Sequence, residues 1–383
     1  MNKHIISFAS IVLGGIILLA GCQKDGTTSK AGSLVKFTAG LKPAATRTSY
    51  SGEIVNNFER INWKDGETIV VWSDKAVDRY NTSANYASYA ISSPKASGVN
   101  STASLGNIKG ENGEGGNGLV WVDGVETYKF WGSSPAISGT PEAGKATFAI
   151  PASQQMNADS TAKTATTVEG DAAVTTVTLP ADMSNAWMFA CVEGAKPGKD
   201  GVELDFYPAF TAFELTLTAD SDYDDDITVK KVELISETGL AGNVATTLVT
   251  GTRTNTVGTA SHTIGASTYV CTPATGNLTY TLPADTKVNK TSSVTFTVFA
   301  LPQNIAGLKL KFYVTVDGEE TTFTGTLKKK NGNTITFGAC EKHRIKGVAV
   351  PGNVWKIYYK PGIVTADEWI EAGEAQTTNL IVE

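Results

Sequence analysis

Few residues of this chain could carry out acid–base or nucleophilic chemistry. It has three histidines, and His262 and His343 lie in different strand and loop contexts with no recognisable nucleophile motif. A catalytic serine or cysteine needs a base, and a group that orients this base, within hydrogen-bond reach. We therefore predict that the chain has no catalytic residue, binds no cofactor and is not an enzyme.

Carboxylates are concentrated in one short segment, where they could bind a metal ion. The aspartates are Asp220, Asp222, Asp224, Asp225 and Asp226. Several carboxylates close together suit a hard cation such as calcium, but this run lacks the spacing and the final glutamate of a helix–loop–helix calcium site. A charged run at a hairpin tip is usually solvated. We predict no metal site, although the sequence leaves calcium open.

Cys22 carries a thiol at the end of an apolar run. A weakly cationic start, Met1 to His4, precedes the apolar stretch from Ile5 to Ala20, which ends in Leu19-Ala20-Gly21-Cys22. This resembles a bacterial lipoprotein signal peptide, in which small residues admit a peptidase and the cysteine is acylated. A short membrane helix is the alternative, but the run is shorter than the ~20 residues that a span needs. We predict a signal peptide over 1–21 and lipidation of Cys22.

The lipid determines where the protein is placed. Two acyl chains anchor a protein stably where one is marginal. Gln23 follows the cysteine, so the aspartate that often marks retention in the inner membrane is missing. We expect the precursor to be anchored in the outer membrane.

Composition limits the fold and the partners. The chain has 383 residues, a formal net charge of -6 and only 18% charged residues, below the usual ~25%. This length favours two domains. The acidic balance argues against a nucleic-acid partner, because no basic stripe is present. Cys191, Cys271 and Cys340 form no C-x-x-C pair, so we expect free thiols on strands.

Strand patterns run through the whole chain. In the first, Val35, Phe37, Ala39 and Leu41 share one face. Hairpin turns are predicted at three dipeptides, which are Asp65-Gly66, Asp123-Gly124 and Asn331-Gly332. Trp63 and Trp121 fall in strand patterns and are expected in the core, although tryptophans could also stack on sugar rings.

The second half alternates more regularly. Apolar residues recur at every second position in three segments, which are 213–217, 294–298 and 308–316. One apolar and one wet face is typical of antiparallel sheets packed as a sandwich. The polar, turn-rich run 195–201 is the best boundary. We predict an all-β chain with two tandem antiparallel β-sandwich domains, over 48–200 and 201–350.

The segment 351–383 is unusually apolar for a terminus. Trp355, Ile357 and Tyr359 alternate with lysines, and Leu380 and Val382 continue the pattern. Such a strand must pair with a sheet edge, either its own or a neighbour's. We interpret the segment as an intermolecular donor strand and expect the two domains to be complete without it.

Arg47 follows the first strand in a loop of small residues, Ala44 to Ser49. A cut between Arg47 and Thr48 would remove 22–47, which holds the lipid and the first strand, and would leave a groove. An ordinary surface arginine is the alternative.

Several motifs follow one another along the chain. After the signal peptide come Thr46-Arg47-Thr48-Ser49 and then the stretch Ile61 to Ile69. Ile150-Pro151-Ala152-Ser153-Gln154 follows near mid-chain, then Phe206 to Leu217 and Phe299-Ala300-Leu301-Pro302. In this order the motifs resemble those of the fimbrillin-like proteins, subunits of type V pili in gut and oral bacteria, and the resemblance spans nearly the whole chain.

The resemblance implies transthyretin-like domains, export as a lipoprotein, proteolysis after an arginine and polymerisation. In that scheme, one subunit's C-terminal segment replaces the strand that its neighbour lost. The strands given up and donated would then use Val35, Phe37, Ala39, Leu41, Trp355, Ile357, Tyr359, Leu380 and Val382. The implied partners are copies of the chain or related pilins, an arginine-specific protease and, before processing, the outer membrane.

We therefore interpret the chain as a stalk or tip subunit of an adhesive pilus, ending in an extracellular fimbrium. The alternative is an outer-membrane surface lipoprotein that binds glycans for nutrient uptake. A glycan binder would have no need of an apolar terminal strand or of a cleavable first strand.

Overall fold

The chain is built almost entirely of β-strands. The computed structural model describes residues 32–41, 50–55, 58–97, 100–107, 118–169, 172–198, 200–223, 226–250, 252–257, 260–265, 268–329, 331–351, 354–360 and 370–377. Within these ranges, the helical structure is a single 3-10 turn, Met183–Asn185. No helix in the described part has the length and apolar character to cross a membrane. The all-β prediction is confirmed.

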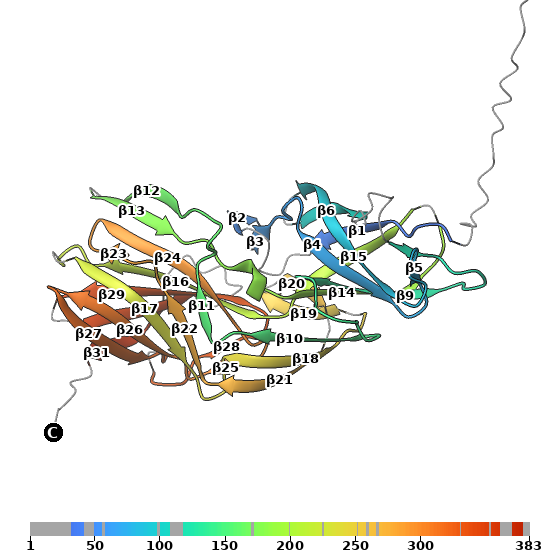
Figure 1. Ribbon diagram of the computed structural model, residues 1–383. Coiled ribbons are helices and arrows are strands. Elements are labelled where there is room, and N and C mark those ends of the chain that lie inside the picture. The colour runs from blue at the N-terminus through green and yellow to red at the C-terminus, as the bar shows by residue number, and fades with distance from the viewer. Residues whose placement is uncertain are drawn as a thin grey trace, which may run out of the picture.

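Seven strands close into a barrel, in the order β1-β15-β14-β9-β4-β6-β7. Their bounds are β1 (Phe37–Leu41), β4 (Thr68–Ser73), β6 (Tyr86–Ser97), β7 (Asn100–Asn107), β9 (Tyr128–Ser134), β14 (Met188–Ala195) and β15 (Val202–Pro208). Two short pairs accompany it, β2 (Tyr50–Val55) with β3 (Phe58–Ile61) and β5 (Val77–Asp78) with β8 (Leu119–Val120). The barrel forms the lobe on the right of Figure 1.

A thirteen-stranded sheet forms the other lobe (Figure 1). Its order is β11-β22-β17-β26-β27-β31-β30-β29-β16-β24-β13-β12, and β23 pairs with β17. Its strands are β11 (Ser153–Gln155), β12 (Lys163–Glu169), β13 (Ala172–Thr178), β16 (Thr211–Ala219), β17 (Ile227–Ile235), β22 (Asn277–Thr281), β23 (Lys287–Val288), β24 (Ser292–Ala300), β26 (Lys309–Val316), β27 (Glu319–Thr326), β29 (Lys342–Val350), β30 (Val354–Lys360) and β31 (Ile370–Thr377).

This large sheet encloses a core, because buried residues from distant strands in its order belong to one cluster. Phe213 and Leu215 on β16 share this core with Val232 on β17 and Phe312 on β26. The alternating sequence of β16 produces a matching alternation of buried and half-buried residues. The period-2 pattern therefore identified this inner face correctly.

A third, three-stranded sheet packs against the barrel-side core. Its order is β10-β18-β21, from β10 (Lys145–Ile150), β18 (Ala241–Thr247) and β21 (Thr268–Thr275). The remaining pairs are β19 (Thr252–Val257) with β20 (Ala260–Gly265) and β25 (Ile305–Ala306) with β28 (Thr336–Phe337). Val244 and Leu248, from the second half of the chain, are buried in the barrel-side core.

Strand pairing does not follow the proposed boundary near residue 200. That boundary falls between β14 and β15, which are hydrogen-bonded neighbours in the barrel. Conversely, β13 pairs with β24 of the large sheet although both β12 and β13 precede residue 200. The chain thus crosses between the lobes several times. The observed sheets are a closed barrel and a curled sheet, and the division into two tandem sandwiches remains a prediction.

The expected turns are present, but the strands around them pair elsewhere. β8 pairs with β5 and β28 with β25, and an isolated bridge between Lys328 and Thr334 spans the Asn331-Gly332 turn. Gly66, Gly124 and Gly332 all have positive φ, between 72° and 83°. β4 pairs with β6 and β9, and not with the segment before its turn. Trp63 and Trp121 are buried, as expected.

Candidate functional site

The first strand occupies an internal position in the barrel. β1 pairs in parallel with β15, where Ala39 lies opposite Leu204, and antiparallel with β7, where it lies opposite Ala103. Val35, Phe37, Ala39 and Leu41 are each at most 3% exposed. The alternating face that the sequence predicted is therefore the inner face of this barrel strand.

Phe37 anchors β1 in the aromatic part of the core. Its ring meets Tyr89 edge-on at 5.3 Å between centroids and Phe130 at 5.1 Å. The Tyr89 hydroxyl accepts a hydrogen bond from the backbone N–H of Leu119 at 2.8 Å, and burial raises the pKa of Tyr89. These edge-to-face contacts fix the position of the strand beyond what area burial alone would do.

The residues just before β1 are held by the backbone. The N–H of Val35 donates to the carbonyl of Leu119 at 2.8 Å, and the N–H of Gly32 donates to Trp121 at the same distance. On the other side, Val202 donates to the carbonyl of Lys36 at 2.8 Å. Removing this segment would leave donors and acceptors of β7 and β15 unpaired, as at an open sheet edge.

At the other end of the chain, the residues expected to be donated lie in the large sheet. β30 pairs antiparallel with β29, with Ile357 opposite Gly347. Trp355, Ile357 and Tyr359 are 1%, 0% and 6% exposed. Trp355 stacks on Phe312 at 4.8 Å between centroids. Our expectation that the second core would be complete without the tail is therefore wrong for β30, whose apolar face packs into that core.

The other expected site residues lie outside the described residues. These are Cys22, Arg47, Thr48, Leu380 and Val382. Arg47 and Thr48 fall between β1, which ends at Leu41, and β2, which begins at Tyr50. The structure brings Val35 and the three apolar residues of β1 together in one core and the three residues of β30 together in another.

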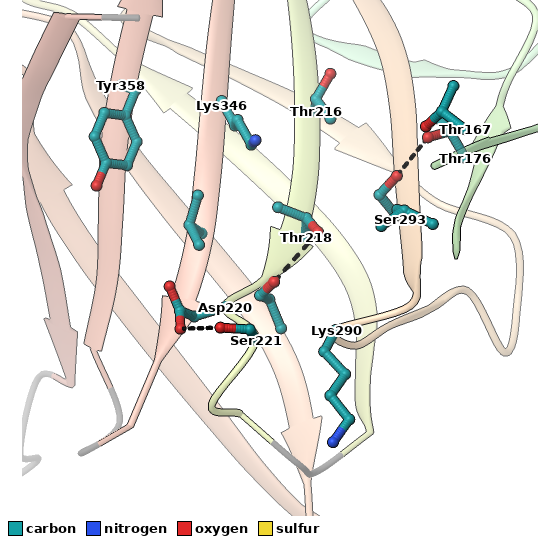
Figure 2. A pocket seen from close by; sticks show the side chains of 13 residues that line it. Thr167, Thr176, Thr216, Thr218, Asp220, Ser221, Lys290, Ser293, Lys346 and Tyr358 are labelled. Carbon is teal, nitrogen blue, oxygen red and sulfur yellow. Dashed lines mark hydrogen bonds between the residues drawn. The ribbon is translucent and has the colours of Figure 1, made fainter. Parts of the chain in front are cut away.

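Sequence reasoning missed a polar groove on the large sheet, which Figure 2 shows from close by. Its volume is about 480 Å³. Strands β12, β13, β16, β24, β29 and β30 contribute to it, and the lining residues are Thr167, Val174, Thr176, Thr216, Thr218, Ala219, Asp220, Ser221, Lys290, Ser293, Lys346, Val348 and Tyr358. They come from four stretches that are far apart in sequence, 167–176, 216–221, 290–293 and 346–358, so no single local motif marks the groove.

Cross-strand register explains how the groove is assembled. Lys346 on β29 lies between Thr216 on β16 and Tyr358 on β30. Thr176 lies opposite Ser293, and their hydroxyl oxygens are 2.7 Å apart. These are the residues that alternate with core positions, so they line the wet face of the sheet. The outward threonines of 214–218 were the available signal.

A buried charge cluster lies next to this face. Glu214 binds Lys342, which is 3% exposed, and its other carboxylate oxygen accepts from Arg344 Nε at 3.0 Å. Burial alone would raise the pKa of Glu214, but the two cations outweigh it and lower the pKa. Both oxygens of this carboxylate are bound by its two partners, so it does not offer a free acceptor to a ligand in the groove.

The described residues form neither a metal-binding cluster nor an activated nucleophile. No group of three or more His, Cys, Asp or Glu side chains there could hold a metal ion. Cys191, Cys271 and Cys340 are free thiols, and burial raises the pKa of Cys271 to about 11. A raised pKa disfavours the nucleophilic thiolate. His343 is buried against Phe213 and Phe337, with its pKa lowered to about 4.

Comparison with known proteins gives matches among solved structures. No family model matches the chain, and no curated protein matches it. It is similar to a putative cell adhesion protein from Bacteroides uniformis, with 14% identity, a TM-score of 0.46 and coverage of 87% of this chain and 98% of the other. A protein of the same description from Bacteroides ovatus has 15% identity and a TM-score of 0.44, over 88% of this chain and 100% of the other. The tip fimbrial protein Mfa3 from Porphyromonas gingivalis has 6% identity and a TM-score of 0.32, over 86% of this chain and 99% of the other.

Proposed function

We propose that the chain is a structural subunit, stalk or tip, of an adhesive cell-surface pilus. In this proposal the precursor is exported as a lipoprotein, acylated at Cys22 and held in the outer membrane. An arginine-specific protease cuts after Arg47, and the processed subunit joins a fimbrium by strand exchange. The resemblance drawn from the sequence supports this scheme, which needs no catalytic group.

One observation carries the proposal, which is the place of β1 in the barrel. β1 is a short internal strand with its whole apolar face buried, and it precedes Arg47 in the chain. After a cut at Arg47, only noncovalent contacts would hold it. Its departure would open a slot between β7 and β15 with backbone groups on both walls. A foreign strand can fill such a slot through main-chain hydrogen bonds and alternating side chains.

The energetics favour an exchange with an incoming strand over spontaneous loss of β1. Burying a Val, Leu or Phe side chain is worth roughly 1.5–3 kcal/mol. Val35, Phe37 and Leu41 would all be exposed by simple departure. An incoming strand of similar apolar content compensates for most of that cost. We therefore expect cut subunits to keep β1 until a donor arrives.

The choice of donor follows from the same argument. Moving Trp355, Ile357 and Tyr359 into a neighbour would fill one slot and open an equal gap in the donor's own core. The free energy gained by burying apolar surface in the acceptor would then nearly equal the free energy lost in the donor. We assign the inserted side chains to Leu380 and Val382, with β30 as the fixed base of the tail. β31, which pairs with β27 and β30, connects the two.

The test is assembly by a variant that cannot be cut at the proposed position. The purified full-length protein and its Arg47→Ala variant are treated with an arginine-specific protease and examined by electron microscopy and N-terminal sequencing. We expect wild-type protein to begin at Thr48 and form fibres, and the variant to keep β1 and stay monomeric. Arg79→Ala serves as a control for loss of an arginine elsewhere.

Fibres of the Arg47→Ala variant at the wild-type rate would refute the role of this cut. The rival function, an outer-membrane glycan-binding lipoprotein, predicts that the wild-type protein also stays monomeric after the cut.

A further inference from the structure

The polar groove on the large sheet is independent of the strand that would be exchanged. Its volume of about 480 Å³ is in the range of small-molecule sites, ~300–1,000 Å³. Ten of its thirteen lining residues carry a hydroxyl, ammonium or carboxylate group, and Val174, Val348 and Ala219 are the apolar members. A ligand that fits must offer many hydrogen-bonding groups.

Lys346 gives the groove a preference for negative charge. In the close-up Lys346 lies between Tyr358 and Thr216 (Figure 2), which are its cross-strand neighbours. No ion pair of Lys346 occurs within the part of the chain that the structure describes. The adjacent carboxylate of Glu214 is bound to Lys342 and Arg344. An ammonium group has three donors and no acceptor, so it calls for an anionic ligand.

The hydroxyl groups suit a polyhydroxylated ligand. Thr176 and Ser293 share one hydrogen bond, and so do Thr216 and Thr295, whose oxygens are 2.9 Å apart. Each such pair uses one hydrogen, which leaves the second hydroxyl hydrogen and further lone pairs for a ligand. The carboxylate of Asp220 accepts from the N–H of Asp222 at 3.1 Å and has acceptor capacity left for a ligand hydroxyl.

We propose that this groove binds a saccharide that carries an acidic group. The acidic group pairs with Lys346, the ring hydroxyls bond to the threonine and serine hydroxyls, and Tyr358 offers an aromatic ring to the sugar's apolar face. Lys290 lies near the other end of the groove (Figure 2). A uronic acid and a sulfated sugar share this chemistry, and the binding experiment separates them.

The experiment is calorimetric titration of the full-length protein in detergent at physiological salt. The acidic probes are trigalacturonate, a hyaluronan tetrasaccharide and a 6-sulfated galactobiose. The matched neutral probe is trigalacturonate with its carboxyls methyl-esterified, which keeps the rings and removes the charge. We expect saturable binding of at least one acidic probe with a Kd below about 1 mM, and none of the ester.

Variants locate the binding. Lys346→Gln removes the charge in the groove, and Lys309→Gln removes one charge from the exposed side chain on β26, outside the groove lining. Losing a charge-assisted hydrogen bond should weaken binding about tenfold or more, so we expect this for Lys346→Gln and no change for Lys309→Gln. Thr218→Val tests the hydroxyl contribution at nearly constant volume and should also weaken binding.

Three results would overturn the proposal. These are no saturable binding of any acidic probe, equal binding of the methyl ester, and equal weakening by Lys346→Gln and Lys309→Gln. Thermal unfolding of each variant at the wild-type midpoint confirms that the fold is intact. Because no step involves Arg47 or the tail, this proposal stands or falls separately from strand exchange.

Discussion

At the scale of single residues, Phe37 is the anchor of β1, and its truncation should loosen that strand. It is 3% exposed and packs edge-on against two aromatic rings. Phe37→Ala should lower the free energy of unfolding by about 3–5 kcal/mol through lost burial and a cavity. The exposed neighbour Thr38 is the matched control, since Thr38→Ala should change stability by less than about 0.5 kcal/mol. Urea unfolding of the uncut protein measures both, and equal effects would contradict the buried position of β1.

Gln154 ties β11 to β24 of the large sheet through two hydrogen bonds. It lies on β11 and is 6% exposed. Its amide nitrogen donates to the carbonyl of Phe299 at 2.7 Å, and its oxygen accepts from the N–H of Phe299 at 2.9 Å. Gln154→Ala leaves both backbone groups buried without this partner, at about 1–3 kcal/mol each. Gln155→Ala, exposed on the same strand, should be nearly neutral in the same thermal melt; a loss as large as that of Gln154→Ala would contradict this role.

His343 makes stability depend on pH in a defined window. Burial lowers its pKa from 6.5 to about 4, and its Nε2 lies 3.1 Å from the carbonyl of Gly338. Between these pKa values, the unfolded chain binds a proton that the folded chain does not, so stability falls as pH drops from about 6.5 to 4. At 1.36 kcal/mol per pKa unit, the loss is up to roughly 3 kcal/mol.

The check for His343 is a comparison of slopes. Urea unfolding at several pH values should show a flatter dependence for His343→Gln than for wild type between pH 6.5 and 4. Carboxylates that titrate in the same range remain in both proteins, so the difference isolates the histidine. Identical slopes would mean that His343 is not buried as a neutral group.

At the scale of elements, β30 and the residues after β31 should have opposite roles. A chain ending at Thr377 keeps Trp355, Ile357 and Tyr359 in the second core and lacks only the proposed inserting residues. We expect it to fold with a wild-type melting midpoint and to form no fibres after the cut at Arg47. A chain ending at Val350 lacks β30 and β31 and should lose its cooperative transition, because about 1.5–3 kcal/mol is lost for each buried side chain. Fibres from the Thr377-terminated chain would exclude residues 378–383 as the donor.

Sequence patterns identified the faces of strands well and their partners poorly. The alternation in β16 and β26 predicted which residues are buried, because a side chain's direction depends on local chain geometry. In β24 it did not, since Thr297 is buried as well as Phe296 and Val298. The turn at Asp65-Gly66 was predicted because Gly66 needs a positive φ, which is also local. The pairing of β4 with β9, and of β13 with β24, depends on the whole core and leaves no local trace.

The same distinction holds for the candidate sites. The buried face of β1 was predicted because its three apolar residues and Val35, just before it, are consecutive members of one alternating run. The groove was missed because Lys346, Thr216 and Tyr358 meet only through the register of three strands from separate parts of the chain. The same period-2 pattern cannot say which molecule or sheet receives β30, and here it lies in its own sheet.

At the scale of the whole molecule, the lobes should act as one rigid body. Val244, Leu248 and Phe299 come from the second half of the chain and are buried in the barrel-side core. Phe299 meets Phe210 edge-on at 4.9 Å between centroids. A stalk or tip that bears load benefits from such shared packing, because neither lobe can rotate without exposing apolar surface. The slot left by β1 then keeps a fixed position relative to the tail that would enter the next subunit.

The most direct test of strand exchange uses two half-competent proteins. The acceptor is a chain ending at Thr377 and cut after Arg47, so its β1 is held only by noncovalent contacts and it has no donor segment. The donor is the full-length Arg47→Ala variant, which has its tail and keeps its own β1. Light scattering on the mixture should show a one-to-one heterodimer, while each protein alone stays monomeric. No complex in the mixture, or polymers of either protein alone, would contradict the account.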